Sequence, residues 1–343
     1  MIHTLTREQA IAGSPDEKSA YMKSSFFEHR NLKNLSSQIE RVLTPNSGIV
    51  IVVGPTGVGK STFARLQLRS ALSDHRIEIQ EDPSCIPAVL VEVDAPDSSK
   101  FNFILFYQRV CAALLAPCPA EVTGLIPTTG EPPDVEKNCR LMFEQAIKNR
   151  KVRRLILDEG VHFTISKTKP ELYGNLLKSL SNRAGMTLII IGAFGCERLA
   201  TCTDQISRRF VVLDFPRYHD CEEDYLEFSS FMMTFGENIP LAGSVNLQKY
   251  IRTLFVASSG IPGAAADIVM AAVRLCAFEG NKWNDACLLA AMPSREAQRR
   301  IAMETTIGEA NLCPYLRGAN PNTYLDEKTT KAELEKSKLR NAK

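Results

Sequence analysis

The sequence predicts an α/β fold in which a parallel five-stranded sheet carries helices on both faces and is followed by a smaller helical domain. Three observations predict it. Apolar strand-like runs alternate with helix-like blocks over the first 218 residues or so. A glycine-rich segment joins the first apolar run to the next helix-like block. The strand-like runs then stop, and the rest of the chain has helical patterning.

Short continuous runs rich in β-branched residues predict the strands, because such runs are typical of strands that are buried on both faces. The predicted strands are residues 49–53, 88–95, 153–159, 187–192 and 209–215. Apolar residues spaced by three and four predict helices at residues 32–43, 101–115, 135–150 and 172–183. We therefore expect a polar N-terminal segment at 1–25, an α/β domain at 26–218, a helical domain at 219–325 and a flexible tail at 326–343.

Composition excludes several classes of protein. The 343 residues are 44% hydrophobic and 23% charged, which excludes wholesale disorder. The net charge of +2 excludes binding of polyanions by bulk charge alone, so any nucleic-acid contact must be local. None of the ten cysteines forms a C-x-x-C pair, which favours buried thiols in a reducing compartment. No apolar run approaches 20 residues and the first residues do not resemble a signal peptide, so we expect a cytoplasmic protein without a membrane partner.

The segment GPTGVGKS, residues 54–61, matches the phosphate-binding pattern G-x-x-x-x-G-K-[ST] and lies between a predicted strand and a predicted helix. Glycines let the backbone wrap around phosphate oxygens, and the N-terminus of the next helix faces the anion. Lys60 is expected to reach the β- and γ-phosphates, and the hydroxyl of Ser61 to bind Mg²⁺. The expected nucleotide-binding residues are Gly54, Pro55, Thr56, Gly57, Val58, Gly59, Lys60, Ser61 and Thr62.

The apolar run LILDE, residues 155–159, places two carboxylates at the end of a predicted strand, where open α/β sheets bind ligands. Asp158 is expected to hold Mg²⁺ through water, and Glu159 to orient and polarise the attacking water. The adjacent Asp-Glu pair favours an ATP hydrolase over a phosphotransferase that excludes water. His162, three residues further on, is interpreted as a structural or relay residue.

Two arginines in QISRRF, residues 205–210, come just before the fifth predicted strand. A planar guanidinium there suits a γ-phosphate that is bound to a neighbouring subunit. Arg209 is the first choice for this role and Arg208 the second. The alternative is that both arginines are solvated or paired with carboxylates. The basic run KNRKVRR, residues 148–154, is either a DNA-binding patch or a helix end whose cations suit the helix dipole.

These motifs together resemble the AAA+ ATPases and, more narrowly, the TnsC/TniB group of transposition regulators. The resemblance covers residues 26–275. It rests on FFEHRNLKNL, GPTGVGKS, VEVDAPDSSKFNFILFYQRV, LILDEGVHF, LIIIGAFG and QISRRF. It implies a three-layer P-loop AAA+ sandwich whose helical domain serves as a lid over ATP and Mg²⁺.

The resemblance also implies a role on DNA. Members of the group assemble on double-stranded DNA as rings or helical filaments, heptamer-like or open, and link a target-selection protein to transposase subunits. ATP hydrolysis then switches the assembly off, and the protein is associated with the nucleoid of the bacterial cytoplasm. Because the segment after the second strand tends to face DNA in this group, Lys100 is a candidate phosphate contact, with Lys167 and Lys169 as weaker ones.

Two departures from the family pattern predict a slow ATPase that a partner or DNA regulates. The fourth strand ends in Gly192, Ala193 and Phe194, where relatives often carry a polar residue that helps to position water. Residues 258–267 lack the arginine with which many relatives sense the γ-phosphate. The alternatives that stay open are a helicase loader or replication initiator on the same module, and a small-molecule kinase. The tail after Asp326 is a candidate contact for the transposase.

Overall fold

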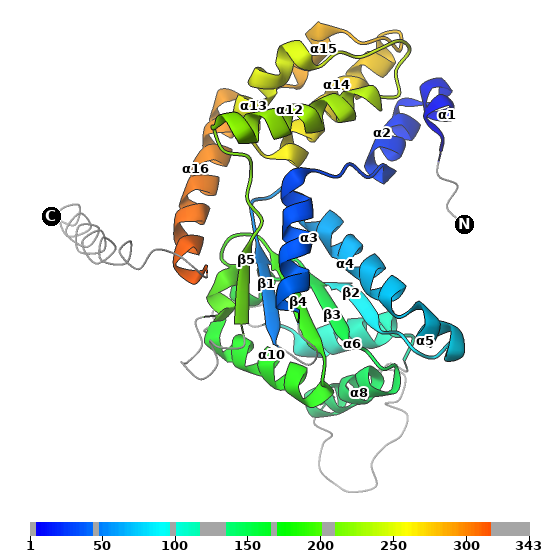
Figure 1. Cartoon of the computed structure of the whole chain (residues 1–343), viewed down its shortest axis with the longest axis vertical. Helices are drawn as coiled ribbons and strands as arrows, with labels where there is room; N and C mark the ends of the chain where they lie inside the picture. The colour runs from blue at the N-terminus through cyan, green and yellow to red at the C-terminus, as the bar shows by residue number, and fades with distance from the viewer. Residues whose placement is uncertain are drawn as a thin grey trace, which may run out of the picture.

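A computed structural model describes residues 5–43, 48–96, 101–116, 135–165, 170–200 and 210–316 (Figure 1). Its strands are β1 (Ile49–Val53), β2 (Ala88–Glu92), β3 (Arg154–Asp158), β4 (Thr187–Gly192) and β5 (Phe210–Asp214). The helices that precede or alternate with them are α1 (Arg7–Ala12), α2 (Pro15–Ser24), α3 (Arg30–Val42), α4 (Lys60–Asp74), α5 (Arg76–Glu81), α6 (Phe103–Ala113), α8 (Val135–Asn149), α9 (His162–Ile165), α10 (Pro170–Ala184) and the 3₁₀ turn η1 (Cys196–Ala200). After β5 come α12 (Glu222–Glu237), η2 (Gln248–Tyr250), α13 (Ile251–Ala257), α14 (Pro262–Phe278), α15 (Asp285–Ala291), α16 (Arg295–Leu312) and η3 (Cys313–Tyr315).

The five strands form one parallel sheet in the order β2-β3-β4-β1-β5, which confirms the predicted sheet. β1 lies between β4 and β5, with Ile49 opposite Leu188 on one side and Phe210 on the other. Every residue of β1 and β4 is buried, as expected for strands covered on both faces. Because the strands are parallel, the segments that follow β1, β3 and β4 all leave from the same edge of the sheet.

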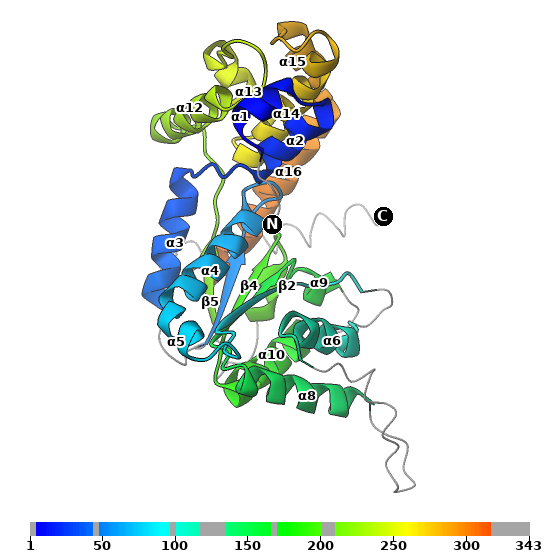
Figure 2. The same ribbon diagram turned by 90° about the vertical axis from the view of Figure 1, so that its right-hand side faces the viewer.

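Helices cover both faces of the sheet, so the predicted three-layer sandwich is also confirmed. Figure 2 shows α3 and α4 on one side of the strands, and α6, α8 and α10 on the other. Alternate side chains of each strand enter the two layers, since successive residues of a strand point to opposite faces. Val50 and Val52 pack with residues of α3 and α4, whereas Ile49 and Ile51 join the larger cluster that includes α6, α8 and α10.

A lid formed by α12 to α15 lies beyond the α/β domain (Figure 1) and has its own hydrophobic core. Phe228 and Met232 of α12, Leu254 of α13 and Val269 of α14 are fully buried in it. The chain reaches the lid through a hinge, residues 215–221, between β5 and α12. The predicted helical domain after the last strand is therefore present.

The N-terminal segment folds into two helices, where the sequence had indicated only a polar stretch. Both helices begin with a capping box, at Thr6 for α1 and at Ser14 for α2. The ammonium of Lys18, 2% exposed, donates to the carbonyls of Ala10 and Ile11 at the end of α1. This hydrogen bonding joins the two helices into a hairpin.

The α1–α2 hairpin docks on the lid and not on the α/β domain. Met22 of α2 belongs to the lid core. Arg274 of α14 pairs with Asp16 at 2.6 Å, and Asn281 donates to the carbonyl of Ile11 at 2.9 Å. The polypeptide between α2 and α3 must therefore cross from the lid to the α/β domain.

The helix α16 runs the other way, from the lid back along the α/β domain (Figure 1). Gly308 lies directly against the ring of Phe194, so closely that a Cβ there would be 2.2 Å from a ring carbon. Glu309 accepts two hydrogen bonds from Arg217 of the hinge, at 2.8 and 3.1 Å. Leu312 is buried in the core of the α/β domain. The last described helix therefore ties the lid, the hinge and the α/β domain together.

Within the described part of the chain, no single helix has the length and apolar character to span a membrane. One pair bent by 119°, residues 248–257 with α14, meets those criteria jointly by length and composition.

Candidate nucleotide-binding site

The glycine-rich loop occupies the turn between β1 and α4, the place that the sequence predicts. Gly57 and Gly59 adopt positive φ angles, 85° and 111°, which glycine reaches without strain. Gly54 lies so close to the backbone that a Cβ would be 2.5 Å from the carbonyl oxygen of Phe215. Val58 is fully buried beneath the loop. The loop is therefore held in one compact conformation at the N-terminus of α4.

Lys60, the first residue of α4, is buried, with 7% of its surface exposed. Its ammonium donates to the carbonyls of Gly54 and Pro55 at 3.1 and 2.8 Å. Burial lowers the pKa of Lys60 below its ordinary value, and the carboxylates of Glu159 and Asp158 oppose that shift. The structure thus brings the predicted lysine and the two predicted acids together.

Asp158 ends β3 and is buried, and Glu159 follows it with a φ of 57°. This left-handed conformation is uncommon outside glycine and costs on the order of 1–3 kcal/mol. The Asp158 carboxylate accepts a hydrogen bond from the Glu159 N–H at 2.9 Å, which stabilises the turn. The next residue, Gly160, packs so closely on β4 that a Cβ there would be 2.3 Å from the side chain of Ile190, so only glycine fits. Sharp turning after β3 therefore directs Glu159 toward the glycine-rich loop.

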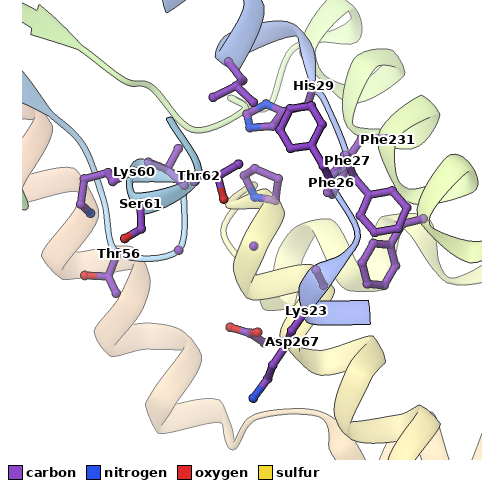
Figure 3. Close-up of a pocket in the computed structure, with 18 of the residues that line it drawn as sticks. Lys23, Phe26, Phe27, His29, Thr56, Lys60, Ser61, Thr62, Phe231 and Asp267 are labelled. Atoms are coloured by element: carbon purple, nitrogen blue, oxygen red, sulfur yellow. The ribbon is translucent and has the colours of Figure 1, made fainter. Parts of the chain in front are cut away.

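A cavity of about 400 Å³ lies between the α/β domain and the lid (Figure 3). Residues 56–62, Glu159 and Ala193 line it from the α/β domain. The other walls come from the α2–α3 connection and the lid, with a largely apolar set: Met22, Phe26, Phe27, His29, Leu32, Phe231, Phe235, Ala266 and Met270. Its polar loop and aromatic wall match the two ends of a nucleotide, a polyphosphate and a base.

The sequence does not reveal the aromatic wall because its residues lie on two segments that are far apart in the chain. Phe26, Phe27 and His29 are in the connection that crosses from α2 to α3, and Phe231 is on α12 (Figure 3). The segment FFEHRNLKNL contributes to the family resemblance, which does not by itself indicate a base-binding wall. Two adjacent phenylalanines before a helix N-terminus were the signal available for a base-binding wall.

The lid contacts the glycine-rich loop directly. The N–H of Gly263, in the first turn of α14, donates to the carbonyl of Gly57 at 2.9 Å. A Cβ on Gly263 would be 2.1 Å from that carbonyl oxygen. The start of α14 can therefore approach the loop only because residue 263 has no side chain.

We expect Gly263→Ala to lower nucleotide affinity at least about 10-fold, or ~1.4 kcal/mol, because the new methyl group must displace Gly57 or α14. Isothermal titration with ATP measures it. The matched control is Gly280→Ala, where φ is 106° but nothing lies within 4 Å of the new methyl. That change strains the backbone without touching the loop, so the control should melt earlier yet bind as the wild type does. Wild-type affinity in Gly263→Ala would contradict the contact's importance.

The lid side of the cavity carries no arginine among its lining residues in the described part of the chain; its charged groups are Lys23 and Asp267. At the end of β4, Ala193 faces the cavity, and the next residue, Phe194, packs under α16. Both departures noted in the sequence therefore persist in three dimensions.

The predicted metal ligands offer a hydroxyl, from Ser61, and a carboxylate, from Asp158, next to the cavity. Hard oxygen donors of this kind suit Mg²⁺. Within the described residues, no group of three or more His, Cys, Asp or Glu side chains could hold a metal ion alone. The donor set therefore fits a Mg²⁺ ion that the phosphates of a nucleotide help to hold.

The structure does not describe the arginines and lysines that the sequence proposes for a neighbouring subunit and for DNA. Arg208, Arg209, Lys100, Lys167 and Lys169 lie outside the described residues, so their roles stay predictions.

The basic run at 148–154 lies inside the described residues and is paired within the chain. Lys151 bonds to Asp82 at 2.9 Å, Arg153 to Glu78 at 2.9 Å, and Arg154 lies 3.7 Å from Asp74. These pairs argue against a free DNA-binding patch there.

Comparisons with known proteins agree with this geometry. Residues 44–199 match a family model described as an AAA domain. The ORC1 protein of Aeropyrum pernix, solved in complex with DNA, is similar in structure, with 16% identity, a TM-score of 0.50 and coverage of 79% of this chain and 66% of that one. The ORC2 protein of the same organism, in ADPNP–ADP complexes, shows 15% identity, a TM-score of 0.49 and coverage of 78% and 69%. AMPPCP-bound DnaA from Aquifex aeolicus shows 10% identity and a TM-score of 0.43, with coverage of 79% of this chain and 67% of that one.

At 16% identity the likeness to ORC1 shows the fold alone, and the chain spans about two thirds of the length of each of these structures. No match to a curated protein was found. The glycine-rich loop, the acidic end of β3 and the match over residues 44–199 agree on the same module. Residues 44–199 are therefore similar to an AAA domain, and the chain has a P-loop AAA+ fold with a helical lid.

Proposed function

We propose that this protein is an ATPase that assembles on double-stranded DNA and regulates transposition. The observation that carries the ATPase proposal is the meeting of Lys60 with Asp158 and Glu159 beside the glycine-rich loop, in a cavity that the lid helps to close. A buried lysine between two carboxylates and a phosphate-sized loop is the arrangement that nucleotide hydrolysis requires.

In the proposed reaction, the loop and the N-terminus of α4 bind the phosphates through backbone N–H groups. Lys60 exchanges its carbonyl partners, Gly54 and Pro55, for phosphate oxygens. Ser61 and Asp158 would hold Mg²⁺, which would neutralise phosphate charge. Glu159 orients the water that attacks the γ-phosphate and accepts its proton.

The nucleotide would also set the position of the lid. Its phosphates would lie against the α/β domain, and its base would lie between the α2–α3 connection and the lid helices α12 and α14, which together line the cavity. Because one ligand contacts both domains, loss of the γ-phosphate changes what holds them together. This coupling supports hydrolysis as the switch between assembled and free protein.

The DNA-related part of the proposal rests on the family resemblance in the sequence. Arg209, or Arg208 in its place, would complete the site of a neighbouring subunit in a ring or filament, heptamer-like or open. A target-selection protein would place the assembly, and the transposase would engage it. Lys100 is proposed to contact DNA phosphate. Because such contacts repeat in an assembly, a net charge of +2 per chain is sufficient.

The experiment that tests this proposal is electron microscopy of the full chain with duplex DNA and a non-hydrolysable ATP analogue. We expect rings or filaments that need both the nucleotide and DNA, and that form on unrelated DNA sequences alike. Incubation with ADP instead should leave dispersed particles. Nucleotide binding without any assembly on DNA would contradict the transposition proposal while leaving the ATPase proposal standing, and would favour the helicase-loader alternative.

A further inference from the structure

Three consecutive residues at the start of α3 bind the hinge. The side-chain amide of Asn31 donates to the carbonyl of Pro216 at 2.9 Å. Arg30 forms ion pairs with Glu223, at 2.7 Å, and with Asp224, at the beginning of α12. His29 contacts Tyr218, a buried tyrosine of the hinge. The start of α3 therefore follows any movement of the hinge.

His29 alone among these three also reaches the glycine-rich loop. Its ring is buried, stacks on Phe215 with centroids 5.9 Å apart and meets Phe231 of the lid edge-on. Nδ1 lies 3.3 Å from the hydroxyl of Tyr218. The ring also hydrogen-bonds to the backbone of Val58, and its Nε2 would be 3.6 Å from a Cβ on Gly59. One imidazole thus joins the hinge to the loop.

The protonation of the ring follows from its surroundings. Burial lowers the pKa of His29 to about 4, so the imidazole is neutral near pH 7. The bond to Val58 favours the protonated ring, so the ring donates it, to the carbonyl oxygen. Since Nδ1 faces Tyr218, the donor is Nε2, and a neutral ring then leaves Nδ1 as an acceptor. The Tyr218 hydroxyl therefore donates a hydrogen bond to Nδ1 of His29, and Nε2–H donates one to the Val58 carbonyl.

Tyr218 is in turn fixed to the lid. Its N–H donates to the carbonyl of Gly260 at 3.0 Å, and a Cβ on Gly260 would be 1.9 Å from the Tyr218 carbonyl oxygen. Residues 258–263 lead directly into the start of α14, which contacts Gly57. Movement of the lid therefore moves Tyr218.

We propose that His29 is a positioning residue that couples lid position to the conformation of the glycine-rich loop through Tyr218 on one side and the Val58 carbonyl on the other. When the lid closes on a nucleotide, the chain from Gly260 to Val58 is complete. When the lid moves away, the Tyr218 hydroxyl no longer donates a hydrogen bond to Nδ1. The imidazole is then held less firmly against the Val58 carbonyl, and the glycine-rich loop gains freedom. This inference rests on the proposed nucleotide binding.

The test is hydrogen–deuterium exchange of the full chain, with and without a non-hydrolysable ATP analogue, read at the loop (residues 54–62) and at the hinge (residues 215–221). In the wild type we expect the nucleotide to slow exchange at both, by at least about 5-fold at the hinge. Tyr218→Phe, which removes one hydroxyl, should keep the protection of the loop and reduce that of the hinge below about 2-fold. His29→Phe, which keeps an aromatic ring but removes both ring nitrogens, should likewise reduce the protection of the hinge below about 2-fold.

The matched control is Tyr225→Phe, the same change in a lid tyrosine that packs on Phe255 and has no contact with His29 among those observed. It should behave as the wild type does at both segments. Wild-type protection of the hinge in Tyr218→Phe would overturn the coupling. Absence of protection at the loop in the wild type would instead overturn the proposed nucleotide binding, so the two failures are distinguishable. A merely structural role for His29 would speed exchange without nucleotide and leave the response to nucleotide unchanged.

Discussion

Lys60→Ala is expected to lower ATP affinity at least about 100-fold, or ~2.8 kcal/mol, and to abolish assembly on DNA. The ammonium is buried and already directed into the loop by the carbonyls of Gly54 and Pro55. Its loss removes charge-assisted hydrogen bonds to phosphate, each worth about 1.5–3 kcal/mol. It also leaves Asp158 and Glu159 without their nearby cation, so the site becomes repulsive to an anion. Isothermal titration and microscopy with DNA measure the two effects.

The matched control for this change is Lys33→Ala on α3. Lys33 is exposed and pairs only loosely with Glu28, at 3.3 Å. The same loss of one lysine side chain there should leave affinity and assembly unchanged. If Lys60→Ala bound ATP within about threefold of the wild type, the glycine-rich loop would not be a phosphate site.

Glu159→Gln is expected to reduce ATP hydrolysis at least about 100-fold while ATP affinity stays within about threefold of the wild type. The amide has the size of the carboxylate, so the turn at φ 57° and the bond from its N–H to Asp158 are retained. It cannot accept the proton of the attacking water. Assemblies on DNA should therefore persist in ATP itself, and phosphate release measures the loss of turnover.

Glu304→Gln, an exposed carboxylate on α16, makes the same chemical change away from the cavity and should hydrolyse ATP at the wild-type rate. Wild-type phosphate release by Glu159→Gln would show that another group activates the water. Persistent DNA-bound assemblies with Glu159→Gln, together with their disassembly in the wild type, would identify hydrolysis as the switch.

Local patterning was sufficient to predict the sheet. The runs at 49–53 and 187–192 are continuous and β-branched, and β1 and β4 occupy those residues. The two short N-terminal helices were missed because they bury few apolar side chains, chiefly Ala10 and Met22, and so have little periodicity. Their capping boxes, at Thr6 and Ser14, were the readable signal. The docking of α16 on Phe194 depends on a glycine, Gly308, whose role has no local signature.

The candidate site was predictable where it is contiguous. The functional side chains of residues 54–61 and of residues 158–159 each lie within a few positions in the sequence. Because β1 and β3 are parallel, both motifs lie at the same edge of the sheet. The link from His29 to Tyr218 joins residues 189 positions apart, and the aromatic wall also joins distant segments, so both arise only when the hinge places the lid. Gly263 was visible as a glycine, but its approach to Gly57 requires the tertiary structure.

The two ends of the described chain are exchanged between the domains: α1 and α2 pack on the lid, whereas α16 returns to the α/β domain. A chain cut at the hinge would separate the lid from α1 and α2, and the α/β domain from α16, and would expose the apolar surfaces around Met22 and Phe194. Neither half is an independent folding unit in this arrangement. The lid completes its packing with α1 and α2, which precede the α/β domain in the chain, and the α/β domain completes its packing with α16, which follows the lid. We therefore expect the lid and the α/β domain to stabilise each other, and a domain boundary drawn in the sequence does not mark a place where the described chain can be divided without loss of packing.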